Sequence, residues 1–196
     1  MATDDKLLWM TKNPNTAAQV GANIVDRALR WDLERPPCMV FDVDETLILN
    51  NPNDDDTFKV QQGGKTLFDY GAARNIPIFI VTARAKSKWA VNYLMKQLRK
   101  AGYDTSNIKG AYLQPRSYVD NGDGGAAFKK MARDKIGADY TIVLNAGDRW
   151  GDHISHDNST DKGTIAVNVP TTKDTYVGIA PRERHIVYGL KFPEDA

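Results

Sequence analysis

The sequence contains a single cysteine in 196 residues, so no disulfide can form within the chain and no metal centre can be built from several cysteine ligands. Cys38 lies in an apolar run, and we interpret it as a core residue. An excess of charge is also lacking, because 26 Lys and Arg residues face 25 Asp and Glu residues and the net charge is +1. This balance does not indicate nucleic acid as a partner, although a local basic patch remains compatible with it.

Long hydrophobic runs are missing as well. No run approaches the roughly 18 apolar residues of a membrane-spanning helix. The first residues, MATDDKLLWMTKNPNT, are acidic early and only briefly apolar, unlike a secretory signal. We therefore expect a cytoplasmic protein with no membrane partner. The length favours a single domain over residues 1–196, and no pattern in the sequence indicates an oligomeric state.

Short apolar runs of strand length recur along the chain. They are nearly continuous rather than alternating, which is typical of strands buried on both faces. The predicted strands cover residues 39–43, 76–81, 108–113, 140–144 and 164–169. Helical patterns occupy about 15–33, 86–101 and 125–136, and in the second of these Trp89, Tyr93 or Leu94, Leu98 and Ala101 share one stripe.

Strands that alternate with helices indicate an α/β fold. We predict a Rossmann-like three-layer α/β/α arrangement with a central, mostly parallel five-stranded sheet. The segment between the first two strands is short and rich in Asn, Asp and Gly. It predicts a small flap or loop insertion at about 47–75 and no large cap domain, so the sheet edge would be open or covered only by a loop.

Polar residues follow several of these strands where each one ends. Asp42 and Asp44 follow the first strand, Thr82-Ala83-Arg84 the second, and Asp148 and Asp152 the fourth. A lone Asp-x-Asp is more often a turn than a catalytic pair. Parallel strands, however, bring their carboxyl ends to one edge of the sheet, where ligands bind. Taken together, these strand ends favour a functional site.

The chemistry of such a cluster is restricted. Carboxylates that lie close together repel and either take up protons or recruit a cation. Oxygen ligands without His or Cys select a hard cation, Mg²⁺ first, which often shares a substrate phosphate. Lys129 and Lys130, early in the helix at 125–136, could supply the positive charge that a phosphate needs. The sequence therefore predicts a magnesium site that binds a small phosphorylated substrate, such as a nucleotide or a sugar phosphate.

The motifs FDVDETL at 41–47 with Asn50, IVTAR at 80–84, a lysine on a later helix, and GDRWGD at 147–152 resemble those of the haloacid dehalogenase superfamily of phosphohydrolases. They are most similar to its acid-phosphatase branch, which includes plant acid phosphatases, vegetative storage proteins and bacterial outer-membrane acid phosphatases. The matching motifs span more than half of the chain. The first and fourth motifs are specific together, whereas the second and third are weak alone.

This resemblance implies a phosphatase mechanism. Asp42 would be the nucleophile that forms an aspartyl-phosphate, and Asp44 the general acid and base. Residues i and i+2 of an extended segment point to the same side, which suits this division of roles. The other implied roles are Thr46 to shape the loop, Thr82 and Lys129 to hold the phosphoryl group, Ala83, Arg84 and Lys130 near the substrate, and Asp42, the Asp44 carbonyl, Asp148 and Asp152 to hold Mg²⁺.

Several alternatives stay open. Lys129 and Lys130 both fit the third motif, and we prefer Lys129 because Arg133 follows it four residues later. A polynucleotide 3′-phosphatase or a nucleotidase of the same superfamily is the enzymatic alternative. A binding or storage module on the same scaffold is the non-enzymatic one. A two-component receiver domain is disfavoured because the third predicted strand ends in Leu-Gln-Pro without an aspartate. His153 and His156 are interpreted as loop residues.

Overall fold

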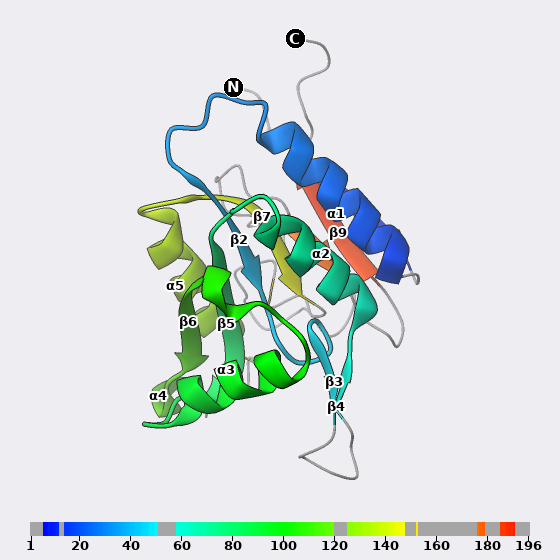
Figure 1. Cartoon of the computed structure of the whole chain (residues 1–196). Coiled ribbons are helices and arrows are strands. Elements are labelled where there is room, and N and C mark those ends of the chain that lie inside the picture. Colours follow the sequence, from blue (N-terminus) through cyan, green and yellow to red (C-terminus); the bar gives the residue numbers. More distant parts are fainter. Residues whose placement is uncertain are drawn as a thin grey trace.

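The structure is a computed structural model that describes residues 6–11, 14–50, 58–119, 125–147, 152, 176–178 and 185–190. Its elements follow one another along the chain in the order of an α/β protein (Figure 1). They are β1 (Lys6–Thr11), α1 (Pro14–Ala28), β2 (Pro37–Phe41), β3 (Ile48–Asn50), β4 (Phe58–Val60), α2 (Gln62–Ala72), β5 (Ile78–Ala85), α3 (Ala90–Lys100), η1 (Thr105–Asn107), β6 (Ile108–Gln114), α4 (Arg116–Val119), α5 (Ala126–Gly137), β7 (Thr141–Gly147), β8 (Tyr176–Gly178) and β9 (His185–Leu190).

The central sheet has the strand order β1-β9-β8-β7-β2-β5-β6 within the described part of the chain. Strands β8, β7, β2, β5 and β6 run parallel, while β9 is antiparallel to β8 and β1 is antiparallel to β9. The predicted α/β class with a parallel central sheet is therefore confirmed. The predicted number of five strands is wrong, because the described sheet has seven. Strands β1, β8 and β9 were not predicted, and the predicted strand at 164–169 lies outside the described residues.

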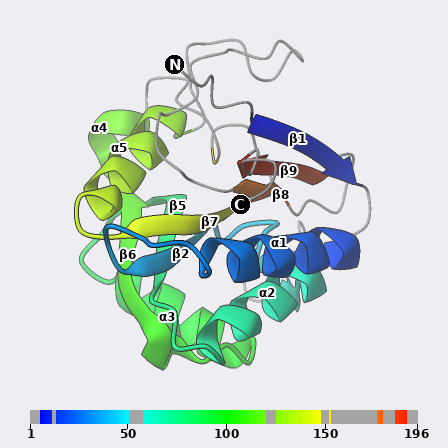
Figure 2. The ribbon, with the colours of Figure 1, turned by 90° about the horizontal axis from the view of Figure 1, so that it is seen from above.

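Helices cover both faces of the sheet, as Figure 2 shows from above. Helices α1, α2 and α3 lie on one face, where their apolar side chains join those of the strands in a large core. Helix α5 lies on the opposite face over a smaller core that contains Cys38, Val40 and Phe128. Residues of β2 alternate between the two cores, because successive side chains of a strand point to opposite faces. This arrangement is the predicted three-layer fold, and Cys38 is buried as predicted.

The predicted elements match the observed ones with shifts at their ends. Helix α1 stops at Ala28 rather than near residue 33, because the chain turns there with hydrogen bonds from Arg30 N to Arg27 O and from Trp31 N to Ala28 O, both of 3.1 Å. Strand β5 continues past the predicted end to Ala85, since it pairs with β6 as far as Gln114.

The predicted apolar stripe of helix α3 is wrong at Trp89, and at its second position Leu94 rather than Tyr93 is the buried residue. Leu94 and Leu98 are buried against the large core, whereas Trp89 is 67% exposed and Tyr93 is 49% exposed. Helical spacing cannot separate Tyr93 from Leu94, since neighbouring residues on a helix lie only about 100° apart. The buried face is therefore centred on the leucines, and the two aromatic residues are left at the surface.

Helix α2 lies in the segment that we predicted to be a flap or loop. Its sequence, QGGKTLFDYGA, contains three glycines, which disfavour a helix by about 1 kcal/mol each relative to alanine. Packing explains why glycine is used here. A Cβ atom at Gly64 would overlap the backbone carbonyl oxygen of Thr46, so the helix can approach the loop after β2 this closely only with glycine at this position.

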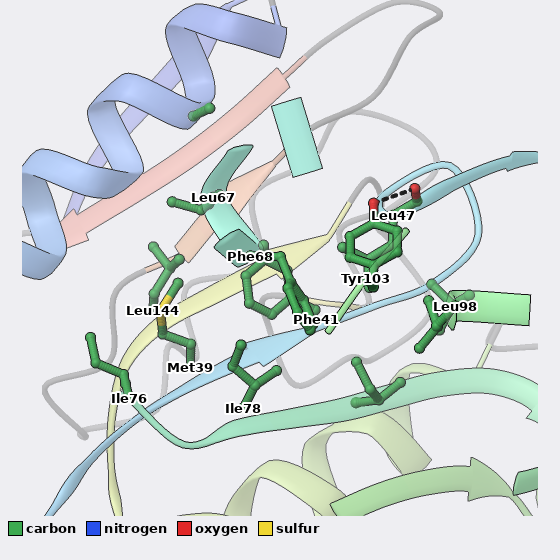
Figure 3. Packing of buried hydrophobic residues seen from close by; sticks show 14 of the residues in the cluster. Met39, Phe41, Leu47, Leu67, Phe68, Ile76, Ile78, Leu98, Tyr103 and Leu144 are labelled. Carbon is green, nitrogen blue, oxygen red and sulfur yellow. Dashed lines mark hydrogen bonds between the residues drawn. The ribbon is translucent and has the colours of Figure 1, made fainter. Parts of the chain in front are cut away.

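The rest of the insertion includes a two-stranded hairpin, β3 paired antiparallel with β4, which extends beyond the carboxyl end of β2 (Figure 1). Aromatic rings pack against one another in the large core. Phe68 packs against Phe41 with ring centroids 5.6 Å apart and against Tyr103 at 4.9 Å (Figure 3). The Tyr103 hydroxyl donates a hydrogen bond of 2.7 Å to the Leu47 carbonyl oxygen (Figure 3). The loop that carries the first motif is thereby tied to the core.

Candidate functional site

Asp42 lies directly after β2, at the carboxyl end of a strand between β5 and β7. Its backbone N–H donates a hydrogen bond of 2.9 Å to Ala146 O on β7. The side chain is 5% exposed, because the parallel neighbours on both sides and helix α5 above enclose it. A carboxylate in such a position is costly unless a charge or hydrogen bonds compensate for its lost hydration.

Lys129 of helix α5 supplies that compensation. Its Nζ atom lies 2.9 Å from Asp42 Oδ1 and also forms an ion pair with Asp152 Oδ1. The side chain of Lys129 is 6% exposed, so both pairs are shielded from water. The two candidates for the third motif are thus placed differently: Lys129 faces Asp42, and Lys130 forms an exposed ion pair with Asp134 on the outer side of the helix.

The group formed by Asp42, Asp152 and Lys129 contains two carboxylates and one ammonium. Burial raises the pKa of Asp42 to about 7, against the opposing effect of Lys129, and the neighbouring carboxylates of Asp152 and Asp44 raise it further. The pKa of Lys129 is also raised, because the attraction of Asp152 and Asp42 outweighs the effect of burial. The lysine therefore keeps its proton, and the carboxylates around it need more positive charge to be fully ionised.

Asp152 reaches this group from the fourth motif. Its side chain lies against Gly147, where a Cβ atom would overlap it, and its backbone carbonyl accepts a hydrogen bond from the Asn145 amide. Asn145 is buried within the apolar strand β7, so this bond also satisfies a polar side chain that has left water. The end of β7 is thereby joined to Asp152.

Asp44 lies on the other side of the site, next to helix α3. Arg84 donates three hydrogen bonds to its carboxylate, from Nε to Oδ2 at 2.9 Å and to Oδ1 at 3.2 Å, and from Nη2 to Oδ1 at 2.6 Å. The remaining Arg84 nitrogen, Nη1, donates to Gln97 Oε1, and Gln97 Nε2 donates to the Tyr93 hydroxyl at 3.2 Å. Asp44 keeps 35% of its side chain exposed, in contrast to Asp42.

Of the remaining predicted site residues, some lie in the described part of the chain and others lie outside it. Thr82 is buried at the end of β5, where its Oγ1 accepts a hydrogen bond of 3.3 Å from the Arg84 N–H, and Thr46 is buried in the turn after Asp44. Ala83 is exposed. Asp148, His153 and His156 lie outside the described residues. The structure therefore brings together Asp42, Lys129 and Asp152, and separately Asp44 and Arg84.

The fit of a metal ion rests on the donor chemistry of these residues. Within the described part of the chain, no group of three or more His, Cys, Asp or Glu side chains is arranged to hold a metal ion. Asp42 and Asp152 do share a cation there, the Lys129 ammonium. All the donors are oxygens, and burial raises the pKa of Asp42, with the neighbouring carboxylates of Asp152 and Asp44 adding to the rise. This chemistry suits a hard cation such as Mg²⁺.

Sequence reasoning missed Gln97, Tyr93 and Asn145. Asn145 could have been found from the sequence, because a buried amide inside a continuous apolar strand needs a hydrogen-bond partner. Nothing in the sequence distinguishes Gln97, since it lies on a helix that is otherwise rich in surface polar residues. Its link to Asp44 depends on how α3 packs against the end of β5.

The alternative of a polynucleotide 3′-phosphatase would need a basic track for nucleic acid near the site. Of the basic residues that could contribute to it, Arg84 is engaged with Asp44, while Arg182, Arg184 and Lys191 lie outside the described residues. The described helices include none that is both long and apolar enough to cross a membrane. The predicted compartment stays a prediction.

No family model matches the sequence, and no curated protein matches it. Similar solved structures do exist. The class C acid phosphatase from Bacillus anthracis superposes with a TM-score of 0.59 at 19% identity, covering 76% of this chain and 65% of that one. A crystal structure of class C acid phosphatase from the same organism with tungstate bound gives 0.55 at 20% identity, covering 71% and 62%.

The chain thus spans a little under two thirds of the length of these phosphatases. At this level of identity, the likeness concerns the fold. The resemblance that the motifs predicted is confirmed at the level of the fold: the chain has an α/β fold similar to that of these acid phosphatases.

Proposed function

We propose that this protein is a phosphatase that hydrolyses phosphomonoesters through an aspartyl-phosphate on Asp42. The observation that carries the proposal is a buried carboxylate at the carboxyl end of the central strand with the Lys129 ammonium 2.9 Å away. Its fold is shared with acid phosphatases, one of which binds tungstate, a tetrahedral oxyanion like phosphate. Small phosphorylated molecules are therefore the substrates that we expect.

In the first step, a carboxylate oxygen of Asp42 attacks phosphorus, and the bond from phosphorus to the leaving oxygen breaks. Asp44 gives its proton to that oxygen, so an alcohol departs rather than an alkoxide. In the second step, Asp44 takes a proton from water, and the hydroxide attacks phosphorus and releases Asp42. Inorganic phosphate is formed, and both aspartates return to their starting protonation states.

The surrounding residues stabilise charge during both steps. Lys129, which is paired with Asp42 and Asp152, would stabilise the negative charge that grows on the phosphoryl oxygens. The buried Thr82 hydroxyl at the end of β5 would donate a hydrogen bond to the same group. Thr46 would keep the turn after Asp44 in shape.

Mg²⁺ is the proposed cofactor. Asp42, the Asp44 backbone carbonyl, Asp148 and Asp152 would hold it. When bound, the ion would favour the ionised form of Asp42 and offset the charge of the phosphate. The described residues that would take part offer oxygen donors alone, which is the preference of this cation.

The test is hydrolysis of p-nitrophenyl phosphate, nucleotides and sugar phosphates with and without Mg²⁺, for the wild type and for Asp42→Asn. We expect Mg²⁺-dependent turnover that the substitution lowers by about a thousandfold or more, because it removes the nucleophile. Thermal unfolding would verify that the variant folds. Turnover retained by Asp42→Asn would contradict the assignment of the nucleophile. A wild type that is inactive on every substrate would favour the binding or storage module.

A further inference from the structure

Gln97 of helix α3 is placed where it can control the orientation of the proposed general acid. Arg84 directs all three of its nitrogen atoms at protein groups: Nε and Nη2 at Asp44, and Nη1 at Gln97. A guanidinium that is used in this way has no nitrogen left without a protein partner. The resemblance implied only that Arg84 lies near the substrate, and these contacts direct its guanidinium at protein groups.

The position of Gln97 is itself well determined. Leu94 and Leu98 are buried in the large core and fix helix α3 against the sheet. Gln97 lies next to Leu98 on the rim of that buried face, and its amide nitrogen donates to the Tyr93 hydroxyl one turn earlier. This second bond sets the direction of the amide, so its oxygen is presented to Arg84.

The geometry points to Gln97 as a positioning residue that holds Arg84 against Asp44, and through it fixes the carboxyl group that protonates the leaving oxygen. The inference rests on the proposed phosphatase function and extends it. Arginine has a long side chain with several rotamers, and a bond at each end of its guanidinium restricts these to one. General acid catalysis depends on such placement, because the proton must reach the leaving oxygen within hydrogen-bond distance.

Two substrates separate this role from a purely structural one. p-Nitrophenolate leaves without a proton near neutral pH, whereas the alkoxide of glycerol 2-phosphate requires one. Loss of a well-placed acid must therefore slow formation of the aspartyl-phosphate from the alkyl substrate and spare it for the aryl substrate. The ratio kcat/KM reports this first step, whereas the later step, in which Asp44 acts as a base, is common to both substrates and enters kcat. A residue that only stabilised the fold, or that bound the phosphoryl group, would affect both substrates alike.

The experiment measures kcat and KM for both substrates with Gln97→Met, which keeps the length of the side chain and removes its hydrogen bonds. General acids contribute about 10²–10⁴ in rate, and we expect loose placement to lose about tenfold in kcat/KM on glycerol 2-phosphate. On p-nitrophenyl phosphate, kcat/KM should change less than about twofold. Gln97→Glu keeps an oxygen for Arg84 and should restore most of the lost rate. Lys96→Met, the exposed neighbour, serves as the control and should match the wild type.

An equal loss of kcat/KM on both substrates, or no loss of kcat/KM on either, would overturn the positioning role while leaving the phosphatase function intact. Failure of Gln97→Glu to recover activity on glycerol 2-phosphate would overturn it as well. A wild type that hydrolyses neither substrate would instead overturn the proposed function, and the inference with it.

Discussion

The site has two sides that use the same chemistry, a cation paired with a carboxylate, in different surroundings. On the α5 side, the side chains of Lys129, Asp42 and Asp152 are 6%, 5% and 2% exposed. On the α3 side, Arg84 and Asp44 are 22% and 35% exposed. The first group is cut off from water, and the second remains in contact with it. A nucleophile gains from the dry side, whereas a group that exchanges protons needs the wetter one.

The largest effect should come from Lys129→Met, which leaves Asp42 and Asp152 buried without their cation. Removing one partner of a buried ion pair costs about 3–5 kcal/mol of the free energy of unfolding, and we expect a loss in this range at pH 8. Denaturant unfolding would measure it. Lys130→Met is the matched control, since its exposed pair with Asp134 contributes about 0.5 kcal/mol or less. Similar losses for the two variants would contradict the contrast in burial.

A smaller effect, of opposite sign, is expected from Asp42→Asn without metal. The pKa of Asp42 is about 7 in the folded protein and 3.8 in the unfolded chain. Stability is therefore lost as the pH rises from about 4 to about 7, and the loss is complete above that range. The amide of the variant does not titrate and has no such loss, so in EDTA at pH 8 the variant should unfold at a temperature higher than the wild type by a few degrees.

The difference in unfolding temperature between Asp42→Asn and the wild type should shrink as the pH is lowered from 7 toward 4, where the folded wild type keeps its proton on Asp42. Thermal scans over this range in EDTA would follow it. A difference that grew toward acid pH would mean that the pKa of Asp42 is lowered rather than raised by the fold.

The smallest effect is expected from Arg84→Met, because water already screens the pair with Asp44. We expect a loss of about 1 kcal/mol or less, reduced further in 1 M NaCl. The loss from Lys129→Met should respond little to salt, since the buried group is poorly screened. Lys86→Met, an exposed cation two residues away, is the control. A loss for Arg84→Met as large as that for Lys129→Met would remove the distinction between the two sides.

Much of the fold could be predicted from the sequence, because the parallel strands are nearly continuous apolar runs. Such runs are typical of strands that are buried on both faces of a sheet. Helix α2 could not be predicted, since its glycines argue against a helix and are explained only by the close approach of Gly64 to Thr46. Strands β1 and β9 were not predicted either, because short apolar runs near chain ends resemble many loops. The exposed positions of Trp89 and Tyr93 depended on a rotation of α3 that periodicity does not resolve.

The acidic site could be located from the sequence because parallel strands gather their carboxyl ends at one edge. Its internal pairing could not. Lys129 and Lys130 differ by one position in a helix, and only the packing of α5 shows that the former faces Asp42. Asp44 and Arg84 lie 40 residues apart, and no local pattern announces that they meet. Pairs of this kind depend on the distances between helices and strands in the folded protein. The spacing of residues along the chain does not give these distances.

The hydrogen bond from the Tyr103 hydroxyl to the Leu47 carbonyl has a thermodynamic consequence for ligand binding. Together with the glycine contact beneath Thr46, it fixes the loop of the two aspartates before any ligand arrives. A loop that is already ordered loses little conformational entropy on binding, so more of the contact energy appears as affinity. Binding of phosphate to this loop should accordingly have a small heat-capacity change, since no apolar surface has to be buried to order it.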